Sequence, residues 1–527
     1  MAPAYGTCQE HTKNIERNMR DYSRSSGIDQ STPLIIRRRV TTYFIPKRFI
    51  FSFLAFTAGC LAVSYNVNIS IAIVSMVNHN VATSNNSKHN ESKDAFVEFL
   101  EEVPNGHLPW SANIESFALG AVYFGQLVSF IPGGRMAELY GGKRMIILCT
   151  LVSSLATLLL PVAANFNPYA FILARVGVGL GTGPIIPIIF YMLNKWIPEH
   201  ERSFHASFIL SGYGIGSFLA VIVSGSLCGT TFLGGWPSVF YIGGLSGVMW
   251  CFTCAYFMHE SPDIHPRISE EEFRTIVTGL EGNKKERIQS IPWKHMIFSV
   301  PLWALAIGFF GQFWLLGFFS TVHALYMGTV LKLPMSTNGI LSCLPHLLRA
   351  FATCLASYPV DLLLKRQVVS KGFVRKGATV INTVVSCGAF LGITYVGRDI
   401  TSTTILFILG GVLGEFVTFG VCLAGNDIAP NLSGTVSGIL NILGVFPFFV
   451  IPALVGWMTQ FQNTIEEWKK VFYTTILIVS ISTLIFVIFG DSDPQPWGVA
   501  SVKSKSKDEN TEVSETETGP KAIENPA

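Results

Sequence analysis

Three ionisable side chains lie inside long apolar runs of this sequence, where they could bind an ion or carry a proton. Glu415 follows a glycine-rich run at 410–414, and His346 and Arg349 are three residues apart, so they would share one face of a helix. A charged side chain at the centre of a membrane costs about 2.5 to 3.5 kcal/mol, so it normally faces a cavity and a partner. We therefore expect Arg349 and Glu415 to face a cavity inside the membrane, where they could bind a charged ligand or a proton. The alternative is a structural ion pair between them.

A loop with one acid and several bases lies between two long apolar runs, at 131–144. Its glycines would let two helices approach at a tight turn, its acid would face a helix N-terminus or a basic side chain, and its last bases would hold the turn on the cytoplasmic side. A degenerate copy at 357–366 carries Asp361 followed by two bases. Two such copies predict a chain built from duplicated helix bundles. The motif residues of the first copy are Gly134, Glu138, Gly141, Lys143 and Arg144.

These residues lie on or between segments that the composition predicts to be membrane spans. The chain has 527 residues, of which 49% are hydrophobic and only 13% charged, with a mean hydropathy of +0.43. A soluble domain carries about 25% charged residues. Twelve apolar runs are long enough to cross a bilayer, beginning with 49–77. This predicts an all-α integral membrane protein with twelve transmembrane helices in two pseudo-symmetric six-helix bundles.

The domain boundaries follow from the same hydropathy pattern. We expect a cytoplasmic N-terminal tail at 1–48, a first bundle at 49–258, a cytoplasmic linker at 259–299, a second bundle at 300–490 and a cytoplasmic C-terminal tail at 491–527. Arginines and lysines precede the first span, and the basic loops at 142–144, 283–287 and 365–376 fall on the same side once twelve spans are counted.

The polar segment at 78–112 is predicted to face the lumen or the cell exterior. It is rich in acidic residues and contains two glycosylation acceptors, Asn85 and Asn90. In the N-terminal tail, Asp29 precedes Leu34 and Ile35 in an arrangement close to an acidic dileucine sorting signal. We therefore expect either a lysosomal or vesicular membrane or the plasma membrane.

Catalytic and metal-binding motifs are missing from the sequence. Ten cysteines are scattered, mostly within apolar runs, and Cys251 and Cys254 form a CxxC without a second pair of ligands. There is no nucleophile elbow, zinc-protease motif or phosphate-binding loop. We expect no enzyme activity, no metal site and no cofactor other than a co-transported H+ or Na+.

Several further segments carry a family resemblance, and the 131–144 loop resembles the corresponding loop of major facilitator transporters. The segments are Lys195–Pro198 with Glu201–Ser203, Gly235–Tyr241, Glu260–Pro262, His265–Ser269, Asp427–Pro430, Glu467–Trp468 and Gln495–Trp497. In combination they resemble the anion:cation symporter family, solute-carrier family 17. That family contains sialin, the vesicular glutamate transporters and the sodium–phosphate cotransporters. The resemblance implies a major facilitator fold and symport of a small organic or inorganic anion with H+ or Na+ by alternating access.

The chain departs from the family pattern at its membrane-embedded charges. Compared with that pattern, Asn66 stands in place of an arginine of the first span and Thr182 in place of a glutamate of the fourth. Gln312 stands where the glutamate carriers hold an arginine in the seventh span. Arg175 is retained at the start of the fourth span and is grouped with the conformational residues, the alternative being a long side chain that only reaches the membrane interface. Given the resemblance, we expect Arg349 to take over the binding of the anionic substrate and Glu415 to be the titrating carboxylate. These replacements keep two alternatives open, a uniporter and a solute sensor that does not transport.

A midplane cavity between the bundles would then be lined mainly by neutral polar side chains. Asparagine, glutamine, threonine and tyrosine suit a hydroxylated or zwitterionic solute at least as well as a compact anion. We expect a monomer in the lipid bilayer, with a small-molecule substrate and no nucleic-acid partner. The predicted cavity residues are Tyr65, Asn66, Tyr123, Gln126, Thr182, Gln312, His346 and Arg349.

Overall fold

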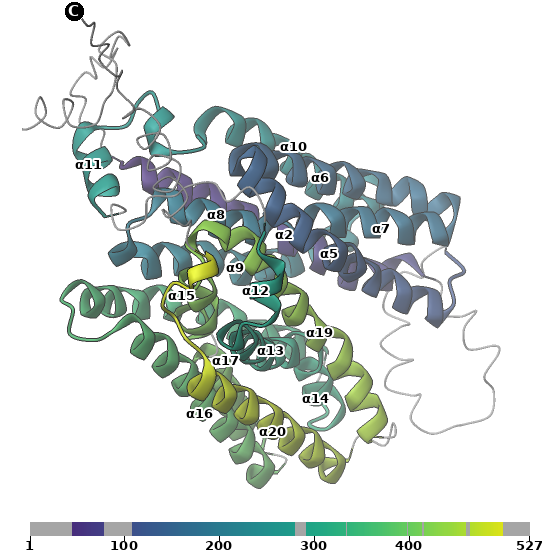
Figure 1. The fold of residues 1–527 in the computed structure, drawn as a ribbon. Coiled ribbons are helices and arrows are strands. Elements are labelled where there is room, and N and C mark those ends of the chain that lie inside the picture. The colour runs from purple at the N-terminus through teal and green to yellow at the C-terminus, as the bar shows by residue number, and fades with distance from the viewer. Residues whose placement is uncertain are drawn as a thin grey trace, which may run out of the picture. The chain divides into compact units, whose positions relative to one another are not determined.

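The computed structural model describes residues 45–77, 108–279, 291–333, 335–397, 399–413, 416–459 and 464–498. Within these ranges the chain is helical, apart from connecting turns and one isolated bridge between Val77 and Leu108. Glu415, Asn85, Asn90 and the dileucine-like segment lie outside the described residues. Figure 1 shows the helices in their chain order.

The first half of the chain forms the N-terminal bundle. Its helices begin and end as follows: α2 (Lys47–Met76), α5 (Ala112–Tyr140), α6 (Gly142–Phe166), α7 (Pro168–Thr182), α8 (Ile185–Trp196), α9 (Arg202–Cys228) and α10 (Pro237–Phe257). α7 and α8 are the two parts of the fourth span, which is interrupted at Gly183 and Pro184.

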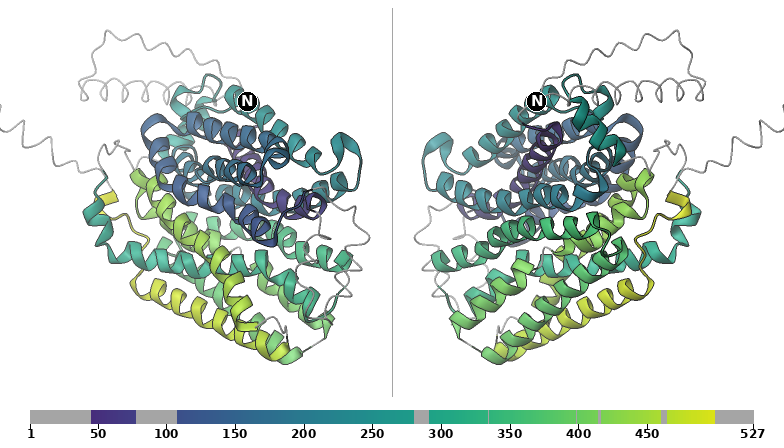
Figure 2. Two further views of the ribbon diagram at one scale, coloured as in Figure 1. Left: turned by 90° about the vertical axis from the view of Figure 1, so that its right-hand side faces the viewer. Right: turned by 90° about the vertical axis from the view of Figure 1, so that its left-hand side faces the viewer.

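The second half forms the C-terminal bundle. Its elements are α13 (Val300–Thr321), α14 (His323–Thr329), α15 (Met335–Lys365), α16 (Lys371–Val396), α17 (Ile400–Leu413), the π-helix η4 (Thr418–Cys422), α18 (Leu423–Asp427), α19 (Ser433–Thr459) and α20 (Ile465–Phe489). Figure 2 shows this green and yellow group of helices beside the purple and blue helices of the N-terminal bundle.

Eleven described helices are long and apolar enough to cross a membrane, and Ile400–Val412 is a shorter apolar helix. The tenth apolar run, at 402–424, is helical where the structure describes it: α17 runs to Leu413, the last described residue before a gap, and the chain is helical again from Phe416 through η4 and α18. Within η4, Gly420 has non-helical angles of φ −83° and ψ −112°, so the span is kinked there. Gly420 packs so tightly on α16 that a Cβ atom there would lie 2.2 Å from the Thr379 Oγ1. This close approach bends the tenth span away from a regular α-helix.

The part of the linker that the structure describes packs on the N-terminal bundle through α11 (Glu270–Thr278). Ile276 of α11 is completely buried, and the Glu272 carboxylate accepts hydrogen bonds of 2.9 Å from the backbone N–H groups of Lys47 and Arg48. These N–H groups begin α2 and have no partner within their helix. The linker therefore caps the first span. A short helix, α12 (Trp293–Ile297), leads from the linker to α13.

We call the side of the molecule that carries this linker the linker side and the opposite side the loop side. One continuous hydrophobic core joins the two bundles on the linker side, where Ala137 and Met192 belong to the same cluster as Leu423 and Val436. On the loop side the described residues form two separate cores, one in each bundle. The bundles are therefore closed against each other at their linker-side ends.

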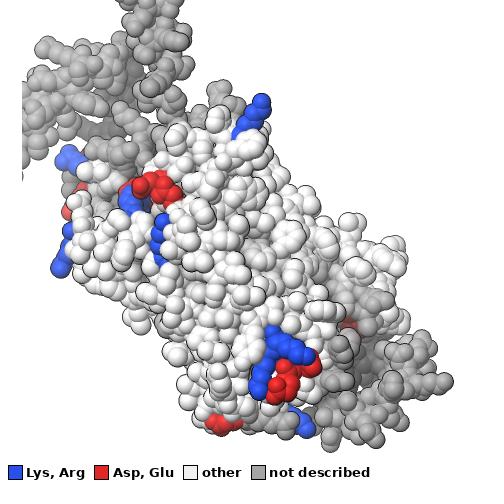
Figure 3. All heavy atoms as spheres, turned by 60° about the horizontal axis from the view of Figure 1, so that its bottom comes forward, with Lys and Arg blue, Asp and Glu red and all other residues white. Residues whose placement is uncertain are grey.

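The outer surface has the character that a lipid environment requires. Large apolar side chains point outward along the spans, for example Leu173, Phe252, Leu355 and Val384. Figure 3 shows one face of the molecule on which charged side chains gather toward the two ends, with a broad uncharged region between them.

Candidate functional site

Arg175 is a buried cation within the spans of the N-terminal bundle. It is fully buried on α7, where its Nη1 donates to the Tyr65 carbonyl at 2.7 Å and its Nε donates to the Ala118 carbonyl at 3.4 Å. The alternative that this side chain only reaches the interface is wrong. Arg175 lies on the same helix face as Gly179 and Thr182, and that face packs into the bundle. Sequence spacing alone could have indicated this orientation.

The guanidinium of Arg175 is incompletely satisfied. Its Nη2 has no hydrogen-bond partner, and no carboxylate in the described part of the chain pairs with it. The next residue after its carbonyl acceptor Tyr65 is Asn66, whose buried Oδ1 also lacks a partner. A free donor on α7 and a free acceptor on α2 are thus left among the described residues of this bundle. Leaving such an atom unsatisfied costs about 1–3 kcal/mol, which a ligand with complementary groups would recover.

Other predicted cavity residues of this bundle are already hydrogen-bonded to protein. The Tyr65 hydroxyl lies 3.0 Å from the Ser154 Oγ and donates to the Gly243 carbonyl at 3.2 Å, so it joins α2 to α6 and α10. Gln126 donates from its Nε2 to the Thr182 Oγ1 at 3.1 Å. These contacts are neutral links between helices of the bundle.

Tyr123 is placed at the contact between the bundles. Its ring stacks on Phe448 of α19 at a centroid distance of 5.9 Å and meets Phe449 edge-on at 5.4 Å. It is also an electrostatic neighbour of Arg175. Two aromatic residues of the C-terminal bundle, Phe448 and Phe449, therefore contact the side chain that neighbours the buried Arg175.

Gln312 belongs to a polar network inside the C-terminal bundle. Its Nε2 donates to the Thr383 Oγ1 at 3.0 Å and to the Thr483 Oγ1 at 3.1 Å, and its Oε1 accepts from the Asn382 Nδ2. Both donors and the acceptor of the amide are thus used within the protein. The structure gives Gln312 a role in holding α13, α16 and α20 together, which the sequence did not indicate.

His346 and Arg349 lie together on α15, as their spacing predicted. The backbone carbonyl of His346 lies so close to α9 that a Cβ on Gly214 would be only 2.8 Å away. Arg349 is buried, and His346 is its electrostatic neighbour. Because Glu415 lies outside the described residues, the expected pair of Arg349 and Glu415 stays a prediction.

The loop at 131–144 and its degenerate copy at 357–366 make matching contacts on the linker side. Glu138 of α5 accepts from the backbone N–H and the hydroxyl of Thr435, at 2.7 and 2.9 Å, at the start of α19. Asp361 of α15 accepts from the N–H groups of Ser203 and Phe204, at 3.2 and 2.7 Å, at the start of α9. Each bundle thus supplies a carboxylate that caps a helix of the other bundle. We call these two contacts the crossed caps.

The remaining residues of the first loop shape the approach of the helices. A Cβ on Gly134 would lie 2.2 Å from the Gly434 carbonyl oxygen, so this glycine is required for contact with α19. Gly141 turns the chain with φ +101°. Beside it, Glu260 accepts from the Lys143 N–H at 2.9 Å and from the Lys195 Nζ at 2.6 Å. Arg144 is exposed.

Three further contacts on the linker side were not predicted from the sequence. Asn194 and Asn426 exchange two amide hydrogen bonds of 2.7 Å between the bundles. Asp427 accepts from Arg375 of its own bundle at 2.9 Å and from Arg202 of the other bundle at 3.3 Å. The sequence marked Asp427 and Arg202 only as family motifs, and nothing local to either residue indicates that they meet.

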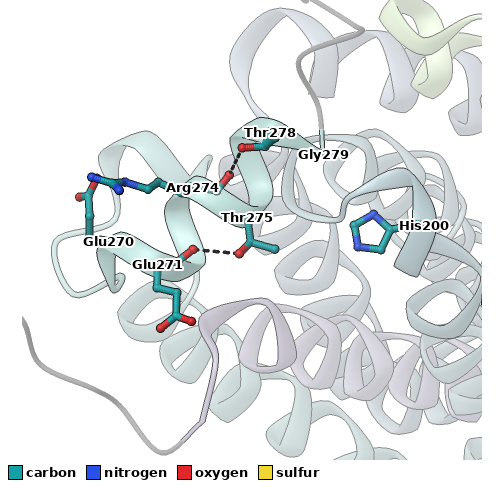
Figure 4. A pocket seen from close by; sticks show the side chains of 7 residues that line it. All are labelled: His200, Glu270, Glu271, Arg274, Thr275, Thr278 and Gly279. Atoms are coloured by element: carbon teal, nitrogen blue, oxygen red, sulfur yellow. Dashed lines mark hydrogen bonds and ion pairs between the residues drawn. The ribbon is translucent and has the colours of Figure 1, made fainter. Parts of the chain in front are cut away.

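Two cavities in the described part of the molecule also lie on the linker side. One, of about 730 Å³, is formed by α11 and His200, and Figure 4 shows that its threonine hydroxyls turn back to their own helix. The other, of about 490 Å³, lies between the bundles and is lined by Arg202, Arg375 and Asp427. None of the predicted cavity residues lines either one. A midplane cavity therefore stays a prediction.

The comparisons with known proteins agree with this architecture. The family model of the Major Facilitator Superfamily matches residues 48–452. Human sialin is 28% identical over 488 residues, which cover 91% of this chain and 98% of sialin. The uncharacterised transporter slc-17.2 of Caenorhabditis elegans is 32% identical over 462 residues, which cover 85% of this chain and 92% of that protein.

Solved structures show the same fold. The proton:xylose symporter XylE, bound to 6-bromo-6-deoxy-D-glucose, superposes with a TM-score of 0.62 and covers 85% of this chain and 97% of its own. Its sequence is only 13% identical, so this likeness concerns the fold alone. The family match and the relatives together give the assignment. The chain is a multi-pass membrane transporter that belongs to the major facilitator superfamily and, within it, to the anion:cation symporter family, solute-carrier family 17.

Proposed function

We propose that the chain is a secondary active transporter that moves a small organic anion by alternating access, coupled to H+ or Na+. The observation that carries this proposal is the buried guanidinium of Arg175, which has two backbone carbonyls as acceptors and no described carboxylate as partner. An uncompensated buried charge costs several kcal/mol. An anion that binds beside Arg175 would supply the missing counter-charge.

The unsatisfied atoms also favour one class of anion. The free Nη2 of Arg175 requires an acceptor such as a carboxylate, and the free Oδ1 of Asn66 requires a donor such as a hydroxyl or ammonium group. A carboxylate that carries hydroxyl or ammonium groups fits both requirements. Inorganic phosphate fits less well, because it brings a multiple negative charge to the single guanidinium of Arg175 and offers few donors for Asn66.

The closed linker side supports alternating access. The crossed caps of Glu138 and Asp361, together with Gly134, hold the bundles against each other at that end. We propose that these contacts form the linker-side gate, with Gly141, Lys143 and Arg144 shaping its turn, and that they separate when the transporter opens there. In this proposal the linker side and both termini face the cytoplasm, and the loop with Asn85 and Asn90 is glycosylated on the other side.

Ion coupling is proposed for the C-terminal bundle. Arg349 is buried on α15, and the tenth span, which contains Glu415, leaves regular α-helical geometry at η4. Broken helices at corresponding positions of two repeats often mark substrate and ion sites in transporters. We therefore propose that Arg349 is a second positively charged side chain that binds the anionic substrate. Glu415 is proposed as the carboxylate that binds and releases the coupling ion. Glu415→Gln is expected to remove ion dependence while binding of the substrate remains.

A uniporter or a non-transporting sensor is the second candidate. It is favoured by the hydrogen bond between Gln126 and Thr182, because this neutral pair stands where the family resemblance implies a glutamate. A protein without a titrating carboxylate in the N-terminal bundle lacks one group that could couple movement of the solute to movement of an ion. Such a protein would equilibrate its solute or only bind it.

Uptake by the purified full chain in proteoliposomes tests these readings. The panel is sialic acid, glutamate, phosphate, urate and a neutral sugar, with imposed pH or Na+ gradients. We expect gradient-driven accumulation of a hydroxylated or amino carboxylate. Equilibration without accumulation would establish the uniporter, and binding without flux would establish the sensor. Preference for the neutral sugar would contradict the proposed role of Arg175.

A first prediction concerns Arg175 itself. Arg175→Gln removes the charge, and each hydrogen bond to a charged group contributes about 1.5–3 kcal/mol, so anion affinity is expected to fall about 10- to 100-fold. Arg175→Lys keeps the charge and should lose less. Arg274→Gln, at an exposed arginine of α11, is the matched control and should bind normally. Equal affinity of wild type and Arg175→Gln, measured by calorimetry with the transported anion, would refute the assignment.

A further inference from the structure

The seventh span ends in a joint that buries a histidine. α13 ends at Thr321, Val322 departs from helical geometry with φ −121° and ψ −12°, and α14 begins at His323. The His323 side chain is only 1% exposed, although it stands at the loop-side end of its span. The joint therefore buries a titratable ring directly after the residue at which the helix of this span is interrupted.

The surroundings of His323 offer it no hydrogen bond. Its ring lies 4.3 Å from the ring of Phe407 and 5.7 Å from that of Phe319, measured between centroids, and neither ring nitrogen has a partner. Two other buried histidines of the described chain differ in this respect. His205 is bonded to the Ser52 Oγ at 2.7 Å, and His265 accepts from the Arg267 N–H at 3.1 Å.

An unsatisfied imidazole at a fully buried site lowers stability. A neutral ring has one donor and one acceptor, and each costs about 1–3 kcal/mol when it is buried without a partner. A phenylalanine would fill the same aromatic surroundings without that cost. Packing alone therefore gives no reason for a histidine at position 323, and its ability to bind a proton is the property that a phenylalanine lacks.

The elements packed around His323 would oppose its positive charge. α13 and α17 present the rings of Phe319 and Phe407, and α14 contributes Tyr326, which packs on Phe407. From α15 the titratable neighbour is His346, which is bonded to the Phe319 carbonyl and has Arg349 as its own neighbour. No described carboxylate is bonded to His323. An imidazolium would thus be desolvated and would face groups that are neutral or positive.

We propose that His323 is a proton-binding residue that couples acidification on the loop side to a movement of the joint between α13 and α14. A proton adds to an unpartnered ring nitrogen, and the resulting imidazolium leaves the aromatic surroundings for water on the loop side. Loss of that proton returns the neutral ring to its buried position. The role of this step in transport rests on the proposed function, because it makes H+ the ion whose gradient is used.

Hydrogen exchange of the full chain in nanodiscs tests the movement without any substrate. After correction for intrinsic exchange rates, the joint at 315–330 is expected to lose about tenfold in protection between about pH 7.5 and pH 5.5, the range in which a solvent-exposed histidine titrates. His323→Phe and His323→Gln should abolish this change. His205→Gln, at a buried histidine of the other bundle, should keep it. Unchanged protection in wild type, or the same loss in both His323 variants, would overturn the proposal.

Proteoliposomes test the coupling, with radiolabelled sialic acid as probe. One pH unit corresponds to about tenfold accumulation per coupled proton, so wild type should concentrate the probe by that factor and His323→Phe should only equilibrate it. Equal accumulation by wild type and His323→Phe would overturn the coupling role. If wild type does not respond to any pH gradient, H+ coupling in the proposed function fails, and the exchange experiment still decides whether His323 moves the joint.

His323→Phe should also unfold at a higher temperature than wild type, because it removes two unsatisfied atoms from the core. Higher stability together with lost pH response is expected only of a functional residue. A variant that is less stable than wild type would show that the ring nitrogens are satisfied, which contradicts the argument.

Discussion

Single side chains show how burial decides between similar residues. Arg175 and Arg274 are both arginines on helices, but Arg175 is completely buried with carbonyl partners, whereas Arg274 pairs with Glu270 at the surface. Only the first is a candidate for binding an anion, because a desolvated charge interacts far more strongly than a solvated one. Among the buried histidines the difference lies in their partners, because His323 has none whereas His205 and His265 are hydrogen-bonded.

His265 leads to a prediction about pH. This histidine packs beside His259, with ring centroids 4.3 Å apart, outside the spans, and burial lowers the pKa of His265 to about 4. Between about pH 6.5 and pH 4 the unfolded chain therefore binds a proton that the folded chain does not, so stability falls as the pH falls through this range. His265→Gln should make the melting temperature less dependent on pH there. An identical pH profile for variant and wild type would contradict the shifted pKa.

Individual helices show how a glycine controls contact between the bundles. α5 carries Gly120, where an added Cβ would meet nothing within 4 Å, and Gly134, where it would lie 2.2 Å from the carbonyl oxygen of Gly434. The two positions belong to one helix and differ only in what faces them. The close approach of α5 to α19 at its linker-side end therefore requires a glycine at position 134. Packing does not require a glycine at position 120.

This contrast supplies a matched pair of variants. Gly134→Ala should prevent full closure of the linker side, since overpacking of this kind costs about 1–3 kcal/mol, and should shift the population toward the linker-open state about tenfold. Gly120→Ala should leave it unchanged. Distances between spin labels at the linker-side ends of α5 and α19 measure the shift. A closed distance in Gly134→Ala would show that the contact is not needed for closure.

The crossed caps make a second prediction for these elements. Glu138→Gln keeps a hydrogen-bonding group at the start of α19 but removes the charge that the helix N-terminus favours, an interaction of up to about 2 kcal/mol at partly buried sites. Asp361→Asn does the same at the start of α9. Each variant should increase the population of the linker-open state, and the effects of the two substitutions should be additive in the double variant. Spin-label distances as closed as in wild type would exclude the caps as part of the gate.

At the scale of the whole molecule, the two bundles meet through pairs that lie far apart in the sequence. The Asp427 carboxylate forms ion pairs with Arg375 of its own bundle and with Arg202 of the other bundle, and both arginine side chains are buried. Breaking the first contact disturbs the inside of one bundle, and breaking the second disturbs the contact between bundles. Opening of the linker side requires only the contact between Asp427 and Arg202 to break, because Asp427 can keep its bond to Arg375.

Variants of the two arginines should therefore behave differently. Arg375→Gln leaves Asp427 and the Phe419 carbonyl short of a partner within the bundle, and the loss of one partner of a buried ion pair costs about 3–5 kcal/mol, so the melting temperature should fall clearly. Arg202→Gln should change the melting temperature less and favour the linker-open state. Thermal unfolding and spin-label distances separate these effects. An equal loss of stability in both variants would contradict this division.

Hydropathy and local motifs determined the class of the protein, because every backbone polar group in a bilayer must be satisfied within a helix and this makes each span visible as an apolar run. They also indicated that Glu138 would meet a helix N-terminus or a basic side chain, and the structure shows both Thr435 and Arg135 beside it. Only the tertiary structure decided which polar groups are used by protein and which are free. Gln312 is saturated, whereas Arg175 and Asn66 are not. Such partners are separated by tens to hundreds of residues, and packing selects them without leaving a local pattern in the sequence.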